Sequence, residues 1–151
     1  MLAVTEVNGC EACSYMHTKF ALEEGMSPEE ISAILGGEVE NIPENELVGI
    51  LFAQHYADQK GKSSKESWQR LVGEYGQERA MVILSIIRMM QVGNIYGIAV
   101  SAIRDRFRGK PSGKTSLIYE ISMIFLVLLY LPIAMIHAIF DKIRGKTLEP
   151  F

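Results

Sequence analysis

The sequence predicts an all-α fold, a helical bundle with a long apolar helix at its C-terminal end. No segment shows the alternation of polar and apolar residues that marks a strand between hairpin turns. Apolar residues instead recur at helical spacing, and glycines and capping residues follow one another at helix-length intervals. The chain has 151 residues, of which 48% are hydrophobic and 22% are charged. A chain of this size and composition can bury one core of its own.

Three short helices are expected in the first part of the chain. The first runs from residue 1 to about residue 7 and stops at the Asn-Gly pair 8–9. The second runs from about Cys10 to Gly25, a glycine typical of helix ends. Residues 27–30, Ser-Pro-Glu-Glu, then supply an N-cap, a proline at the first helical position and a capping-box glutamate. The third helix, which starts there, ends at the glycine pair 36–37.

Three more helices are expected in the middle of the chain. The first follows the proline at position 43 and reaches Lys60. The second is short, is capped by the serine at 63 or 64, and holds Trp68 and Leu71. The third is long, from about residue 77 to 107. For its polar Gln91 and Asn94 we favour packing at a helix interface, with a position facing the pocket as the alternative. The stripe that predicts the first of these helices consists of Leu47, Ile50, Leu51, Gln54 and His55.

A final helix begins at about Ser116 and is unusually apolar. Between Ile121 and Ile139, nineteen residues carry no formal charge apart from a proton on His137. This run approaches the length that spans a bilayer. A helix buried on all sides within an oligomer is the alternative, and a kink at Pro132 fits both. Basic residues flank the run on both sides: Arg104, Arg106, Arg108, Lys110 and Lys114 before it, and Lys142, Arg144 and Lys146 after it.

Charge is unevenly distributed along the chain. Residues 1–60 contain eleven acids and two bases, whereas residues 61–151 contain seven acids and thirteen bases. Such a basic half is typical of a protein with an anionic partner. A nucleic-acid site would have aromatic residues among its bases, and only Phe107 lies within the densest basic run. We therefore expect no nucleic acid and favour a membrane surface, with the positive-inside rule placing the N-terminal flank in the cytoplasm.

The two cysteines of the chain, Cys10 and Cys13, are candidates for redox chemistry. A pair three residues apart closes almost no loop, so it is a poor structural staple. The first residues lack the basic region and long apolar run of a secretory signal, and we expect a cytoplasmic protein. On a helix, both thiols and His17 fall within an arc of about 60°. This geometry allows a disulfide, proton transfer from Cys13 to His17, and a thiolate favoured by the helix N-terminus.

Other interpretations of the pair remain open. A c-type haem site requires histidine directly after the second cysteine, where Ser14 stands. A structural zinc site requires four ligands, and Cys10, Cys13 and His17 supply three, with His55 and His137 the only further histidines. A thioredoxin fold would require strands around the motif. An inert cysteine pair in a core is the simplest alternative.

Residues 2–31, LAVTEVNGCEACSYMHTKFALEEGMSPEEI, resemble the core of the carboxymuconolactone decarboxylase / alkylhydroperoxidase D (AhpD-like) superfamily. The shared pattern is an apolar helix, N-G-C-x-x-C-x-x-x-H, A-x-x-x-G and a capped E-E-I. The CxxCxxxH form is similar to the peroxidase branch. This resemblance implies an AhpD-like helical bundle, a homo-oligomer, and catalysis without a metal or organic cofactor.

The resemblance also implies roles for individual residues. Cys13 would attack the peroxide, Cys10 would resolve the product, and His17 would relay the proton. Peroxidase members carry a relay glutamate further upstream of the first cysteine than this sequence reaches, so either the start is incomplete or another acid serves. Glu6 is the nearest stand-in. His55, one turn beyond Leu51, is expected to be a hydrogen-bonded core histidine, with support of the thiol site as the alternative.

The sequence therefore predicts a thiol-dependent oxidoreductase that reduces peroxides, organic hydroperoxides above all. Its electrons are expected from a dithiol donor, a lipoylated or thioredoxin-like protein. We expect residues 1–108 to form the redox domain, 109–115 a linker, and 116–151 an apolar segment that packs in an oligomer or associates with a membrane through 116–144. Two alternatives are a membrane-associated redox sensor or interaction protein with little turnover, and a lactone decarboxylase.

Overall fold

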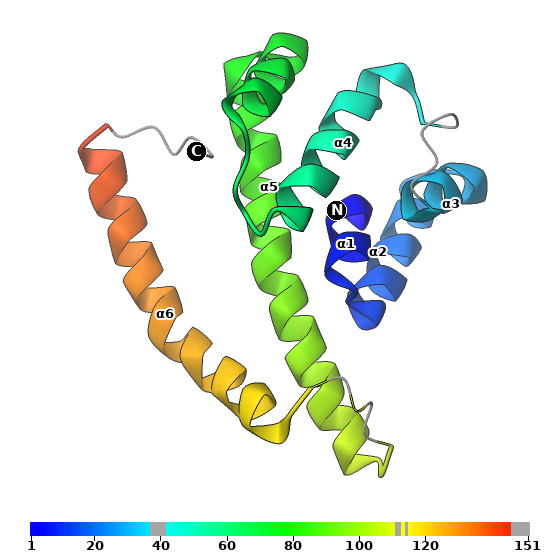
Figure 1. Ribbon diagram of the computed structural model, residues 1–151, viewed down its shortest axis with the longest axis vertical. Helices are drawn as coiled ribbons and strands as arrows, with labels where there is room; N and C mark the ends of the chain where they lie inside the picture. The colour runs from blue at the N-terminus through cyan, green and yellow to red at the C-terminus, as the bar shows by residue number, and fades with distance from the viewer. Residues whose placement is uncertain (37–41, 111–112, 114, 146–151) are drawn as a thin grey trace. The chain divides into compact units, whose positions relative to one another are not determined.

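The computed structural model describes residues 1–36, 42–110, 113 and 115–145, and within these ranges it contains helices and no strand. The predicted all-α fold is therefore confirmed (Figure 1). Gly37, Pro111, Ser112, Lys114 and residues 146–151, which carry parts of the expected helix end, linker and basic flanks, lie outside the described residues. The helices are α1 (Leu2–Asn8), α2 (Glu11–Glu23), α3 (Pro28–Gly36), α4 (Glu44–Asp58), α5 (Lys65–Phe107) and α6 (Leu117–Ile143).

The chain divides into two compact units, and the division falls within α5. The first unit comprises residues 1–94, and the second begins at Ile95. The first unit holds α1 to α4 and most of α5, and the second holds the last turns of α5 together with α6. The functional division after residue 108 that the sequence suggests stays a prediction.

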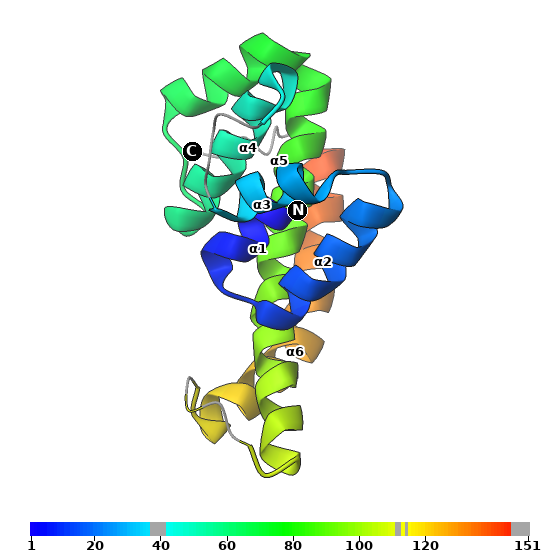
Figure 2. The same ribbon diagram turned by 90° about the vertical axis from the view of Figure 1, so that its right-hand side faces the viewer.

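Helix α1 is the centre of the first unit. It contacts α2, α3 and α4, and both views show it beside α2 and α4 (Figures 1 and 2). Four of its seven residues, Leu2, Ala3, Val4 and Thr5, are buried. A helix this short is unstable alone in water, so the burial of its apolar side chains, worth about 1.5–3 kcal/mol for a leucine or valine, holds it in place. The core around it includes Ile31, Ile34, Phe52, Tyr56, Trp68, Leu71, Leu84 and Ile87.

The helix boundaries follow the predicted caps. Gly9 has φ 68°, a left-handed conformation, and ends α1. The capping box at α3 is confirmed, because the Ser27 amide donates to Glu30 Oε2 over 2.8 Å and the Glu30 amide donates to Ser27 Oγ over 3.2 Å. Ser64 Oγ accepts from the amide of residue 67, and Ser116 Oγ accepts from that of residue 119. These bonds satisfy amides that a helix N-terminus leaves without partners.

Helix α5 is interrupted where the sequence predicts two separate helices. Gly76 has φ 77° and ψ 161°, which is not helical, so the ribbon is two helices joined at a kink. The first part carries Trp68 and Leu71 into the core, and the second part carries Leu84 and Ile87. The expected break before residue 77 is therefore confirmed.

The buried face of α4 differs from the predicted stripe. Leu51 and His55 are exposed, whereas Phe52, Ala53, Tyr56 and Ala57 are buried. Apolar residues occur on more than one side of this helix, and packing against α1 selects the face that is buried. The expectation of a core position for His55 is wrong for this reason.

Helix α6 and the end of α5 are joined by a polar cluster within the second unit. Glu120 is only 1% exposed, and Arg106 donates to its two carboxylate oxygens over 2.7 and 3.0 Å. Thr115 Oγ1 also donates to this carboxylate, over 2.7 Å, and the Arg106 guanidinium donates to the Thr115 carbonyl. Beyond this cluster, Tyr96 donates to the carbonyl of Met123 over 3.1 Å. A buried carboxylate with this many partners is satisfied.

Among the described residues, α5 and α6 are long and apolar enough to cross a membrane by length and composition. That test alone is weak evidence, since core helices of soluble proteins also pass it. Membrane association is possible on this ground.

Candidate functional site

Cys10 and Cys13 are joined by a disulfide at the start of α2. Their Cα atoms are 5.2 Å apart, which is within the range that a disulfide bridges. Cys10 is the N-cap of α2, and its Sγ accepts a hydrogen bond from the Cys13 amide over 3.3 Å. The side chains of both cysteines are buried, with 2% and 7% exposed. The backbone therefore holds the two cysteines close enough to form the expected disulfide.

The local sequence explains this placement of the thiols. Left-handed Gly9 ends α1, and the chain then turns so that Cys10 is extended, with φ −87° and ψ 90°, before α2 begins. Cys13 lies in the first turn of α2, beside amides that are not used by the helix itself. In the reduced protein these amides and the helix dipole favour the thiolate form of either sulfur.

His17 lies one helical turn beyond Cys13 and is buried, with 8% of its side chain exposed. Residues four apart share one face of a helix. Burial lowers the pKa of His17 below its ordinary value of 6.5, so its imidazole is neutral at pH 7. Its Nδ1 is buried and has no hydrogen-bond partner within the described part of the chain. A neutral imidazole nitrogen without a partner, on a residue one helical turn from a thiol, can accept a proton.

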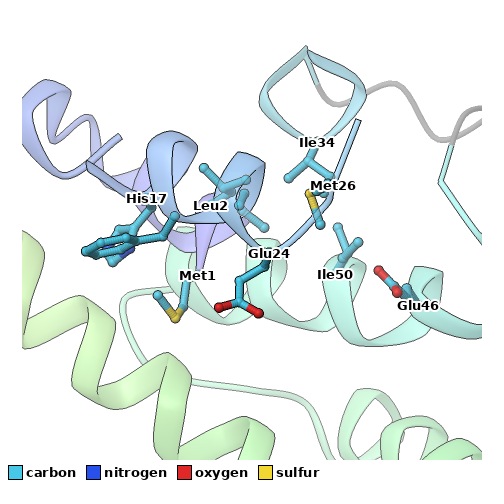
Figure 3. A pocket seen from close by; sticks show the side chains of 11 residues that line it. Met1, Leu2, His17, Glu24, Met26, Ile34, Glu46 and Ile50 are labelled. Atoms are coloured by element: carbon cyan, nitrogen blue, oxygen red, sulfur yellow. The ribbon is translucent and has the colours of Figure 1, made fainter. Parts of the chain in front are cut away.

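A pocket of about 320 Å³ opens beside His17. Its wall is mainly apolar and is built by α1, α2, α3 and α4 together. Figure 3 shows His17 at one end of the pocket and Glu46 at the other, with Glu24 between them. Neither cysteine is part of the lining, whereas His17, one helical turn beyond Cys13, is. The lining comprises Met1, Leu2, Ala3, His17, Phe20, Ala21, Glu24, Met26, Ile34, Glu46 and Ile50.

The two other sequence-predicted residues are placed away from this pocket. Glu6 is on α1, with an exposed side chain, and does not line it. His55 lines a separate hollow on α4 and α5, whose wall contains neither the cysteines nor His17. The structure thus brings together Cys10, Cys13 and His17, whereas the roles of Glu6 and His55 stay predictions.

The sequence did not indicate Phe20 beside His17 or Thr5 in the core. Phe20 contacts His17, with ring centroids 6.3 Å apart, and also lines the pocket. Its position three residues after His17 was a usable signal, because such residues share a helix face. Thr5 Oγ1 lies 3.3 Å from Asn94 Oδ1 and donates to it, and both side chains are fully buried. That bond confirms the expected packing role of Asn94 at a helix interface.

The helices and the thiol pair define an all-α protein with a dithiol site at a helix N-terminus. Residues 1–40 match the model of the carboxymuconolactone decarboxylase family. This match confirms the resemblance to the AhpD-like superfamily over the part of the chain that carries the cysteines and His17. No curated protein and no solved structure matches the chain.

Proposed function

We propose that this protein is a thiol-dependent oxidoreductase that reduces organic hydroperoxides through a Cys10–Cys13 dithiol/disulfide cycle. The observation that carries the proposal is the disulfide at the N-terminus of α2 with a buried histidine one turn away. The match of residues 1–40 to the carboxymuconolactone decarboxylase family model supports the same chemistry. The expected reductant is a dithiol, such as a lipoylated or thioredoxin-like protein.

The reaction begins with the reduced pair. His17 accepts the proton of Cys13, and the Cys13 thiolate attacks the terminal peroxide oxygen, forming an S–O bond as the O–O bond breaks. The alkoxide that leaves takes the proton from His17 and departs as the alcohol. Cys13 is now a sulfenic acid, oxidised by two electrons.

The cycle is completed by the second thiol. The sulfur of Cys10 attacks the sulfenic sulfur, the disulfide forms, and hydroxide leaves with the Cys10 proton as water. A dithiol donor then returns the pair to the reduced form by two exchange steps and is itself oxidised to a disulfide. Because the Cys13 amide donates to Cys10 Sγ, Cys10 is stabilised as the thiolate that leaves during this exchange.

The pocket beside His17 supports an organic rather than an inorganic peroxide. Its apolar wall would bury the hydrocarbon part of a substrate, at about 25 cal/mol per Å² of apolar surface removed from water. Glu24 and Glu46 lie in the lining and would repel a carboxylate-bearing substrate. Uncharged hydroperoxides are therefore the proposed substrate class.

The test is consumption of cumene hydroperoxide coupled to oxidation of dihydrolipoamide. Cys13→Ser should abolish turnover, and Cys10→Ser should stop it after a single oxidation of Cys13. His17→Gln should lower the rate constant for thiol oxidation by about 100-fold or more. Ser14→Ala, in the same helical turn, is the matched control and should act like the wild type.

Two outcomes would contradict the proposal. A Cys13→Ser variant that consumes hydroperoxide like the wild type would remove the thiol mechanism. Lactone decarboxylation that survives in Cys13→Ser, with no hydroperoxide consumption by the wild type, would instead favour a decarboxylase.

A further inference from the structure

Apolar side chains occupy every side of α6. Four consecutive residues, Leu128 to Leu131, are 70%, 58%, 59% and 55% exposed. Because successive residues of a helix are rotated by 100°, these four cover the full circumference. A helix at the surface of a globular protein has one apolar face toward the core and one polar face toward water. Within the second unit, the described residues leave the whole circumference of α6 uncovered at these positions.

The length of this apolar run fits the hydrocarbon layer of a bilayer. Ile121 to Ile139 contains no Asp, Glu, Lys or Arg. At 1.5 Å per residue it is about 28 Å long, against about 30 Å for the hydrocarbon core. A second copy of the chain would cover only one stripe of such a helix, whereas lipid covers all sides.

The charges at the ends of the run favour a lipid surface over a second copy. Arg104, Arg108 and Lys110 are exposed before it, and Lys142 and Arg144 are exposed after it. Anionic lipid headgroups attract basic segments next to a membrane helix. Two copies packed along α6 would bring basic ends together in either orientation.

One carboxylate adjoins the run, and the fold neutralises it. Glu120 immediately precedes Ile121, and Arg106 and Thr115 hold both of its oxygens. An unpaired carboxylate at the edge of the hydrocarbon layer would oppose insertion. The ion pair therefore leaves the start of the apolar run without an uncompensated charge.

We propose that α6 crosses a lipid bilayer with anionic headgroups, with the Arg106–Glu120–Thr115 cluster at the point where it enters the lipid. The thiol pair then belongs to a chain that α6 anchors in that membrane. This inference concerns α6 alone and stands independently of the proposed peroxidase activity.

The first test is partitioning of the full-length protein into vesicles of phosphatidylcholine and phosphatidylglycerol, measured by flotation. The wild type should float with the vesicles and should stay bound during a wash with 1 M salt. At this salt concentration the Debye length is about 3 Å, so the electrostatic attraction between basic residues and lipid headgroups is screened. Leu128→Lys, at the centre of the run, should lower the bound-to-free ratio by about 100-fold. Ile118→Lys adds the same charge at a more exposed residue outside the run, 82% exposed, and should bind like the wild type.

Circular dichroism checks that both lysine variants keep their helix content, since both replaced side chains are exposed and neither substitution disturbs the core. Release of the wild type by salt, or equal binding of both variants, would overturn the proposal. A defined, lipid-free oligomer as the only species in the presence of vesicles would overturn it in favour of a second copy.

The second test separates a crossing helix from one that lies on the surface. Trypsin is added outside intact vesicles, and the fragments are identified by mass spectrometry. Cleavage after Arg108 or after Arg144, but never after both in one molecule, is expected for a crossing helix. Cleavage at both flanks of the same molecule before the vesicles are dissolved would show that α6 lies on the surface, and would exclude the crossing.

Discussion

The Cys13 amide donates a hydrogen bond to Cys10 Sγ over 3.3 Å, so that the first sulfur of the redox pair is also the cap of the helix that carries the second. One atom therefore stabilises the start of α2 and takes part in the proposed exchange. Substitutions at Cys10 change both properties, and the choice of replacement separates them.

Cys10→Ser should keep the cap and remove the chemistry, because a serine oxygen accepts the same amide. Cys10→Ala should lose both, and under reducing conditions it should be less stable than Cys10→Ser by about 1 kcal/mol. Urea unfolding with excess reductant measures this difference. Equal stability of the two variants would mean that the sulfur does not act as a cap.

The burial of His17 predicts a pH dependence of stability. Its pKa is lowered in the folded protein from 6.5, whereas the unfolded chain titrates near the ordinary value. Between these two pKa values the unfolded chain binds more protons, so the free energy of unfolding decreases as the pH falls below about 6.5. Above that pH the imidazole is neutral in both states, and the buried His17 no longer lowers the free energy of unfolding. His17→Gln should flatten this part of the profile, measured by urea unfolding between pH 5 and 8.

The same histidine predicts the pH dependence of the reaction. Because its pKa is lowered, the imidazole stays able to accept the Cys13 proton below pH 6.5. The rate of hydroperoxide-driven disulfide formation should therefore persist into mildly acidic solution and fall only below the lowered pKa. A stopped-flow pH profile that is identical for His17→Gln and the wild type would contradict a proton-transfer role.

The backbone conformation at position 76 requires glycine, although there is space for a larger side chain. Its φ of 77° and ψ of 161° belong to a region that is essentially restricted to glycine, and nothing lies within 4 Å of an added Cβ. Gly76→Ala should destabilise the protein by about 1–3 kcal/mol through backbone strain. Gly73→Ala, equally open but helical, should stabilise it by up to about 1 kcal/mol. Thermal unfolding of both variants tests this; a neutral Gly76→Ala would mean the kink is not required.

The Arg106–Glu120 pair predicts a strongly non-additive double substitution. Arg106→Gln leaves a buried carboxylate without its cation, and Glu120→Gln removes the acceptor charge, so each should increase hydrogen exchange in the first turn of α6. The double variant should be less perturbed than Arg106→Gln alone, because no uncompensated charge remains. Arg104→Gln, on an exposed side chain, is the control and should change little. Additive effects would contradict the coupling.

The acids of the pocket predict substrate preference. Glu24→Gln combined with Glu46→Gln should raise kcat/KM for a carboxylate-bearing hydroperoxide several-fold while leaving cumene hydroperoxide unchanged. The gain should shrink at high salt, where the exposed carboxylates are screened. Equal changes for both substrates would exclude an electrostatic role for these acids.

Local signals in the sequence were sufficient to predict where several helices begin and end. The Ser27–Glu30 box, left-handed Gly9 and the break at Gly76 each depend on one or two neighbouring residues, whose conformational preferences act over a single turn. The shared face of Cys10, Cys13 and His17 was predictable for the same reason, since it follows from helical spacing alone.

The helices, their caps and the thiol pair with its histidine are therefore predictable from local patterns of residues. Packing between helices selects which face of α4 is buried, and it leaves His55 on the surface. It also built the pocket beside His17 from four helices and paired Thr5 with Asn94 across 89 residues. The physical reason is that an apolar pattern with several candidate faces acquires one buried face only when a partner helix packs against it. The Cys10–Cys13 disulfide is local, whereas the pocket that would give it a substrate exists only in the folded chain.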